Sequence, residues 1–310
     1  MKRKIVTTIA AFSTLFMLSG TMPGMLSNAK ATEVEKQGAK VERPKSSQQV
    51  SRNAVEKEKL RASRLKAELN QQAVKAVADT ILVLDLLDQG KSKEALEKIK
   101  DVIGELEVVL AANKDAKLVP VRTYSVVVDL KMGVEQVKDA LKQVKGLLDD
   151  GKVQEARILL STLQSEIDIV VEQLPLATYP DAMKLASKYI VDGKLDQAKS
   201  IITTALNSMV VETIVIPLPL IRAYDLVDEA SKIAKTNKDQ ALKYLDNARK
   251  QLKIAKALGY VQGSETEYQD LHKRIDDIEK EIQGSNKPEA MFQELLNKLR
   301  KLKENITSRK

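Results

Sequence analysis

The chain has 310 residues, of which 43% are hydrophobic, 30% charged and only 3% aromatic, with no cysteine and a formal net charge of +8. The lack of cysteine excludes disulfides and thiolate metal sites, so burial of apolar side chains must hold the fold. The scarcity of aromatic residues argues against sugar-binding and base-stacking surfaces. Basic and acidic residues are interspersed, which is typical of a solvated helical surface, so we expect no nucleic-acid partner.

The N-terminus has the layout of a secretory signal peptide. Basic residues at positions 2–4 precede an apolar run over residues 5–18, and small and polar residues lead to an A-x-A site ending at Ala31. The run is shorter than the roughly 20 residues of a membrane-spanning helix, although an uncleaved anchor is an alternative. We expect export, cleavage after Ala31 and no stable membrane insertion. Removal of residues 1–31 takes away four basic residues and no acidic one, which lowers the charge from +8 to +4.

The next part of the chain predicts a leader and two helices. Residues 32–60 lack an apolar period and are rich in Lys, Glu, Ser and Gln, which indicates a disordered, charged leader. From about Leu60 a helical period predicts a first long helix to about Leu87. A second amphipathic helix follows, and its apolar stripe consists of Ala95, Ile99, Val102, Leu106 and Val109.

The middle of the chain mixes helical and extended signals. Residues 117–128 break the helical period with a proline and a run of valines, which predicts a short strand or an extended crossing. One helix then ends at Gly151, and its partner runs from Val153 to about Leu174. After a loop bounded by two prolines, a further helix begins at Asp181.

A second β-branched run, "ETIVIPLPL" at 212–220, follows the helical period after Gly193. It predicts an extended strand or a buried crossing, with Pro219 placed to begin the next helix. One option is a two-stranded ribbon that pairs Thr213–Ile216 with Leu118–Thr123.

The C-terminal residues 264–310 predict an antiparallel helical hairpin. Two heptad stripes flank the turn "GSNKP", and they consist of Tyr268, Leu271, Ile275, Ile278 and Ile282, then Phe292, Leu295, Leu299, Leu302 and Ile306. The hairpin can pack on its own chain or on another subunit. Its apolar faces and the "TIVIPLPLI" run favour association of protomers into a homo-oligomer.

A Gly-Lys pattern recurs in "LDQGKSKEA", "DDGKVQEA" and "VDGKLDQA", with a weaker copy, "KTNKDQA". A phosphate loop of the Walker type needs a preceding strand and an earlier glycine, and neither is found. Each copy instead ends one helical period and begins another, as in the corner of an αα-hairpin. The predicted helix-corner residues are Gly90, Gly151, Gly193 and Asn237. Their unequal spacing favours a compact bundle with degenerate repeats.

No set of residues predicts catalysis. His272 is the only histidine and lies on the polar flank of the first heptad stripe, as a surface helical residue would. Acidic pairs such as Asp149-Asp150 are adjacent in sequence and do not face one another on a helix. We therefore predict that the protein is not an enzyme, with no catalytic residues, no metal site and no cofactor.

Several segments point to one family. With the export signal, "LVPV" at 118–121, "TYPDA" at 178–182, "VDGKLDQAKSII" at 191–202 and "ETIVIPLPLIRAYDLVDEA" at 212–230 resemble the YfdX family of bacterial periplasmic proteins. The resemblance covers about residues 70–262. It implies a mainly helical, self-associating periplasmic protein linked to acid and heat stress, with chaperone-like activity, and it carries over no catalytic residue. The leader and the C-terminal hairpin depart from shorter family members and leave the oligomeric state open.

These patterns predict an all-α (mainly α) bundle of αα-hairpins with degenerate repeats, alone or with a minor two-stranded β ribbon. The expected parts are a signal peptide (1–31), a leader (32–60), a YfdX-like helical domain (61–263) and a C-terminal hairpin (264–310).

The predicted function is that of a non-enzymatic periplasmic stress-response protein that binds stressed client proteins or maintains the envelope. A helical scaffold or a small-ligand binding module is the alternative. Tyr179, Pro217 and Pro219 form the candidate interface, and the expected partners are further copies of the chain and unfolded clients.

Overall fold

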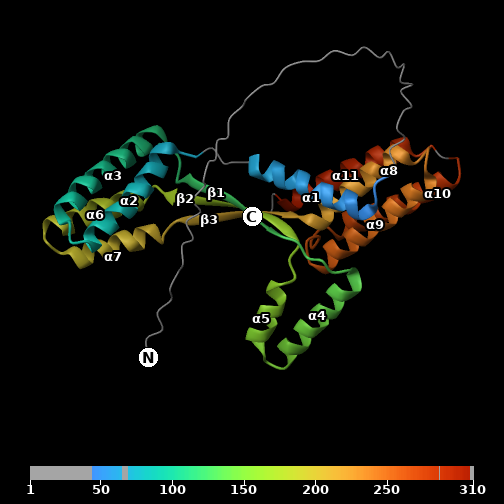
Figure 1. The fold of residues 1–310 in the computed structure, drawn as a ribbon, viewed down its shortest axis with the longest axis horizontal. Helices are drawn as coiled ribbons and strands as arrows, with labels where there is room; N and C mark the ends of the chain where they lie inside the picture. The colour runs from blue at the N-terminus through green and yellow to red at the C-terminus, as the bar shows by residue number, and fades with distance from the viewer. Residues whose placement is uncertain (1–43, 65–68, 286, 308–310) are drawn as a thin grey trace, which may run out of the picture. The chain divides into compact units, whose positions relative to one another are not determined.

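The computed structural model describes residues 44–64, 69–285 and 287–307, and this part contains eleven helices and three strands (Figure 1). The signal peptide and residues 32–43 of the leader lie outside the described residues. The helices are α1 (Ser47–Arg64), α2 (Gln71–Asp88), α3 (Ser92–Ala112), α4 (Val134–Asp149), α5 (Val153–Ser161), α6 (Tyr179–Val191), α7 (Leu195–Leu206), α8 (Leu218–Ile233), α9 (Lys238–Ala257), α10 (Glu265–Gln283) and α11 (Glu289–Thr307). The strands are β1 (Leu118–Val128), β2 (Glu166–Pro175) and β3 (Val210–Pro217). The prediction of a mainly α-helical fold is confirmed.

The helices α2, α3, α6 and α7 form one helical core together with residues of β1 and β2. The predicted stripe of α3 is buried, from Ala95 to Val109. Small residues that recur after the corners, such as Ala95 and Ala198, are fully buried and let paired helices approach closely. Burial of each large aliphatic side chain in this core contributes about 1.5–3 kcal/mol relative to exposure.

A second core forms between α1 and the helices α8 to α11. Both predicted C-terminal heptad stripes are buried in it, together with Tyr244 and Leu252 of α9. The C-terminal hairpin therefore packs on its own chain, which the sequence had left open.

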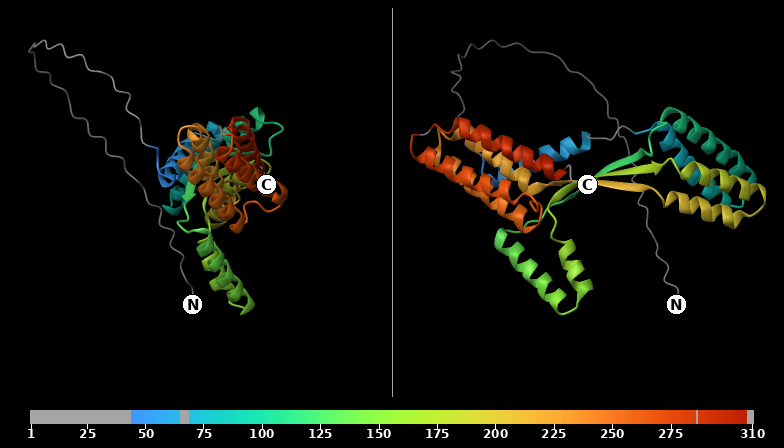
Figure 2. Two further views of the ribbon diagram at one scale, coloured as in Figure 1. Left: turned by 90° about the vertical axis from the view of Figure 1, so that its right-hand side faces the viewer. Right: turned by 180° about the vertical axis from the view of Figure 1, so that it is seen from behind.

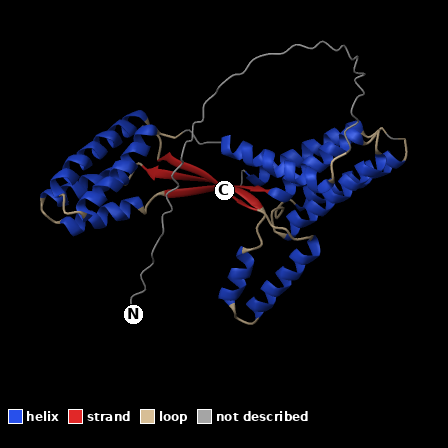
Figure 3. Cartoon of the chain, in the orientation of Figure 1, coloured by secondary structure: helices blue, strands red, loops and turns tan. Residues whose placement is uncertain are grey.

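The three strands form one antiparallel sheet in the order β1-β2-β3, drawn in red in Figure 3. The central strand β2 pairs Val170 with Tyr124 of β1 and with Thr213 of β3. Residues of β1 and β2 near Leu174 pack into the core of α2, α3, α6 and α7, while Ile167 packs against α1 and α8. The sheet thus contributes side chains to separate hydrophobic clusters.

The predicted two-stranded ribbon is wrong in its pairing. Thr213–Ile216 lies opposite residues 167–170 of β2, and β1 pairs with the other edge of β2. The predicted ribbon omitted β2 because that segment was assigned to a helix.

The predicted helix from Val153 to about Leu174 is therefore also corrected. The helix α5 ends at Ser161, and Glu166–Pro175 is the central strand. Six of the ten residues of β2 are buried or half-buried apolar residues, and they lie on both faces, so its apolar positions also match helical spacing. Periodicity alone cannot separate a strand buried on both faces from a helix.

Part of the predicted leader is helical. Residues 47–60 belong to α1, whose buried positions Val50, Ala54, Glu58 and Ala62 recur at helical spacing. The sequence does not reveal this stripe as apolar, because two of its four positions are alanines and one is a glutamate. The expected single helix from Leu60 to Leu87 is two helices, since α1 ends at Arg64 and Asn70 caps α2 by accepting a hydrogen bond from the Ala73 N–H at 3.0 Å.

The helices α4 and α5 form a hairpin between β1 and β2 in the sequence and lie side by side in the right-hand view of Figure 2, where they are green. Its hydrophobic cluster is small and centres on Ala140, Val144, Ala156 and Leu163. This hairpin therefore has less buried apolar area to hold it than the two helical cores have.

Candidate functional site

The three predicted glycine corners have a left-handed backbone. The φ angle is +75° at Gly90, +73° at Gly151 and +69° at Gly193. At each corner the N–H of the following lysine donates to the carbonyl oxygen five residues earlier at 2.8 Å, which caps the preceding helix. The corner amides are therefore used in helix caps and do not surround a phosphate site.

Asn237 forms its corner in a different way. Its φ angle is −147°, and its side-chain oxygen accepts a hydrogen bond from the Gln240 N–H at 3.1 Å as the N-cap of α9. The position of this corner agrees with the prediction, but here the amide side chain caps the following helix and the backbone is not left-handed.

The structure does not place Tyr179, Pro217 and Pro219 on the surface as a candidate interface would require, because all three side chains are buried within the fold. Tyr179 is 0% exposed in the core of α2, α3, α6 and α7, and burial raises the pKa of its hydroxyl to about 12. Pro217 precedes α8 and Pro219 lies in its first turn, as predicted for a proline that begins a helix. These residues therefore serve packing and helix initiation.

The sheet exposes two strand edges. Within the described residues, β1 and β3 each pair with β2 alone, so the outer edge of each has no partner strand. Val126 and Val127 of β1 are 43% and 36% exposed, and Val210 and Val211 of β3 are 40% and 58% exposed. Unpaired backbone groups beside exposed β-branched side chains form a template for another extended segment. We call these two segments, 122–128 and 210–214, the open strand edges.

The α4–α5 hairpin adds further exposed apolar side chains. Leu148, Val153, Ile158 and Leu160 are each at least half exposed. Together with the strands, this hairpin carries nine of the fifteen large hydrophobic residues that are exposed in the described part of the chain. Exposed apolar surface is thus concentrated here and not spread evenly over the helices.

Two of the three carboxyl groups on the central strand, Glu166 and Asp168, have a raised pKa. Glu166 is 8% exposed, and the nearby Tyr260 hydroxyl accepts a hydrogen bond from the Ser165 N–H at 2.9 Å and donates one to the Glu166 carboxylate. Burial raises the pKa of Glu166, and the negative charge of Asp168 raises it further. Burial also raises the pKa of Asp168. The sequence signal for these groups is the acidic residue that alternates with β-branched ones in "SEIDIVV".

His272 is less exposed than a surface residue would be. Its ring lies edge-on to Tyr268 with 4.6 Å between centroids, and its Nε2 atom is buried without a hydrogen-bond partner. Burial lowers its pKa, and the positive charges of Arg249 and Lys253 lower it further. The expectation of a surface residue is therefore corrected, since packing against Tyr268 covers the ring.

The described residues show neither a metal-ligand cluster nor a membrane-spanning helix. No group of three or more acidic or histidine side chains among them is arranged to hold a metal ion. None of their helices combines the length and apolar character needed to cross a membrane.

The fold defines a mainly α-helical protein of paired helices around a small antiparallel sheet. Residues 76–215 match the family model described as YfdX protein. A solved structure of YfdX from Salmonella Typhi has 17% sequence identity to the chain and a TM-score of 0.34, covering 48% of this chain and 93% of its own. None of the curated proteins matches the chain.

Proposed function

We propose that the protein is an exported, non-enzymatic stress protein that binds extended segments of unfolded client proteins along its open strand edges. The main support for client binding comes from the outer edges of β1 and β3, which have exposed valines and no partner strand among the described residues. Main-chain hydrogen bonds to such an edge do not depend on the client sequence.

Acid and heat release apolar, extended segments from partly unfolded proteins, and these segments aggregate by pairing edge to edge. A strand edge that accepts them competes with this pairing. The exposed apolar side chains of the α4–α5 hairpin add surface for the same clients.

The proposal includes export to the periplasm with cleavage after Ala31, and self-association of the protomers. Terminal sequencing of the exported chain tests the cleavage, and light scattering tests the association. A small-ligand binding module is the second candidate, and a charged cavity between α1, α8 and α11 favours it.

The first experiment measures client protection. Residues 32–310 are added in near-equal amount to a client that aggregates on heating or acidification, and light scattering follows the aggregate. We expect suppression by the unchanged chain. In the variant Val126→Lys/Val211→Lys, each lysine places a charge beside an open strand edge, so we expect a several-fold loss of suppression.

The matched control is Val191→Lys. Val191 is 67% exposed but lies on α6, away from the sheet, so the same chemical change should leave suppression unchanged. If the unchanged chain suppresses no aggregation at every pH tested from acidic to neutral, client binding is contradicted. Equal losses in the control and in the double variant would contradict the role of the open strand edges.

A further inference from the structure

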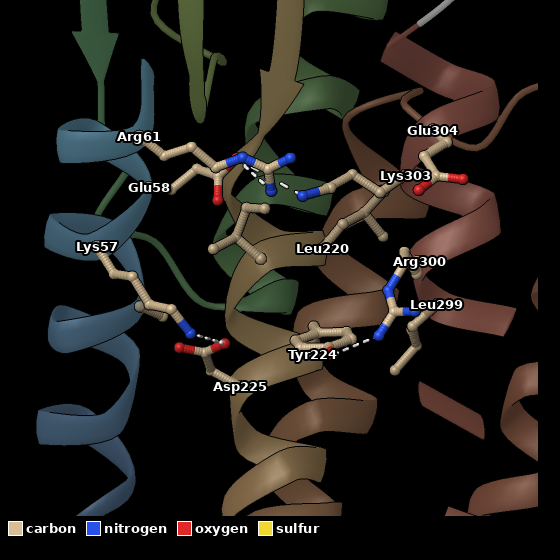
Figure 4. A pocket seen from close by; sticks show the side chains of 12 residues that line it. Lys57, Glu58, Arg61, Leu220, Tyr224, Asp225, Leu299, Arg300, Lys303 and Glu304 are labelled. Atoms are coloured by element: carbon tan, nitrogen blue, oxygen red, sulfur yellow. Dashed lines mark hydrogen bonds and ion pairs between the residues drawn. The ribbon is translucent and has the colours of Figure 1, made fainter. Parts of the chain in front are cut away.

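A cavity of about 320 Å³ lies between α1, α8 and α11 (Figure 4). These helices come from the beginning, the middle and the end of the described chain, and all three lie outside residues 76–215. The volume is at the small end of the range for ligand sites in proteins. The cavity is separate from the open strand edges, so an inference about it does not depend on client binding there and instead specifies the second candidate function.

The lining combines apolar and charged groups. Leu220 of α8 and Leu299 of α11 are buried and contribute apolar surface to it. Four basic side chains line it as well, against three acidic ones, and they are Lys57, Arg61, Arg300 and Lys303. A cavity with apolar surface and an excess of cationic groups suits a ligand that has an apolar body and an anionic group.

Two of the three acidic groups, Glu58 and Asp225, lie at long distances from the basic ones. Glu58 lies 3.9 Å from Arg61 and 3.6 Å from Lys303, and Asp225 lies 4.0 Å from Lys57 (Figure 4). These separations exceed the usual 2.7–2.9 Å of a charge-assisted hydrogen bond. Lys57 and Arg61 keep 74% and 63% of their side-chain surface exposed, so both can turn toward a ligand.

Arg300 offers the clearest anion contact. Its guanidinium donates a hydrogen bond to the Tyr224 hydroxyl at 3.2 Å, and the negative charge of Glu304, one turn further along α11, also acts on it. Other arginines of the same helical core are tightly paired, for example Arg249 with Asp276 at 2.6 Å and Arg274 with Glu294 at 2.7 Å. Arg300 therefore retains charged N–H donors, and the planar guanidinium suits the two oxygens of a carboxylate.

We propose that this cavity binds a small carboxylate with an aromatic or short aliphatic body, its anionic group at Arg300 and Tyr224 and its apolar body against Leu220 and Leu299. The neighbouring cations Arg61 and Lys303 add to the positive potential at the carboxylate. Tyr224 supplies a hydroxyl that can donate to the same group once Arg300 turns toward the ligand.

Isothermal titration with 2-naphthoate tests the proposal on the chain of residues 32–310. We expect saturable binding by the unchanged chain. The variant Arg300→Gln should bind about tenfold more weakly, the loss expected for one charge-assisted hydrogen bond. Arg300 is exposed, so this change should leave the fold intact, as circular dichroism will show.

Lys301→Gln is the matched control, because Lys301 is an exposed cation of the same helix that does not line the cavity. It should bind naphthoate like the unchanged chain. The neutral isostere 2-naphthamide should bind at least tenfold more weakly than naphthoate. Absence of saturable binding, equal effects of the two variants, or equal affinity for the acid and the amide would each overturn the proposal.

Discussion

Gly193 joins α6 to α7 with φ at +69°, a region in which an L side chain is strained even where space is free. A Cβ atom added there would meet no atom within 4 Å, so the cost of a substitution is conformational and not steric. Backbone geometry, and not ligand binding, thus explains the glycine at this corner.

We predict that Gly193→Ala lowers the free energy of unfolding by about 1–2 kcal/mol. Gly104→Ala is the control, since Gly104 lies inside α3 with free space around its Cα, and alanine there should add about 0.5–1 kcal/mol. Urea titrations of the two variants measure both changes. A shift of the same sign in both would contradict the assignment of the corner.

At this scale the helix corners and the helix start at Pro219 were predictable, and the burial of Tyr179 was not. A glycine between two helical periods indicates a left-handed cap from local sequence alone. Nothing local tells whether Tyr179 faces solvent or core, because that depends on helices distant in sequence. Arg300 was missed for the same reason, since its neighbour Tyr224 is brought to it by the packing of α8 and α11.

The C-terminal helices α10 and α11 pack against α9 and α8. Their heptad stripes are narrow, and each is buried against the body of the same chain. Ion pairs on the flanks, such as Arg249 with Glu279 at 2.7 Å, accompany this packing. The hairpin is therefore part of a continuous hydrophobic core and does not form a separate unit.

We predict that a chain ending at Gly263 associates non-specifically and is less stable than the chain of residues 32–310. Its truncation exposes the apolar residues of α8 and α9 that α10 and α11 bury. Light scattering measures the association, and the thermal midpoint measures the stability. A monodisperse truncated chain with an unchanged midpoint would show that the hairpin contributes nothing to the core.

Among the elements, helices with large apolar stripes were predictable, and two others were not. The strand β2 is buried on both faces, so its apolar run carries no period of two. The helix α1 buries two valines, two alanines and Glu58, so its stripe lacks the leucine and isoleucine side chains on which the prediction depended. Both errors arise because neighbours far away in the chain define which faces are buried.

Across the whole molecule, buried carboxyls connect stability to pH. Burial raises the pKa of Glu166 and Asp168 above their ordinary values of 4.5 and 3.8. Between those values and the raised ones, the folded state binds more protons than the unfolded state. Lowering the pH through this window therefore raises the free energy of unfolding, and this contribution is lost as the pH rises again.

We predict that Glu166→Gln/Asp168→Asn removes this contribution. The variant should gain stability relative to the unchanged chain at neutral pH, where it lacks two desolvated charges, and the difference should shrink as the pH falls. His272 acts in the opposite direction because its pKa is lowered, but it is present in both chains and cancels in the comparison. Urea titrations at several pH values measure the difference, and a constant difference across them would contradict the prediction.

By itself, the sequence determined the mainly helical class, the glycine corners, the helix start at Pro219 and the family resemblance, because each depends on residues close together in the chain. Only the tertiary structure decided that β2 is the central strand, that the C-terminal hairpin covers its own chain, and that two strand edges stay open. It also brought α1, α8 and α11 around one cavity. These features depend on which surfaces meet, and that choice is made by apolar burial between segments separated by up to hundreds of residues.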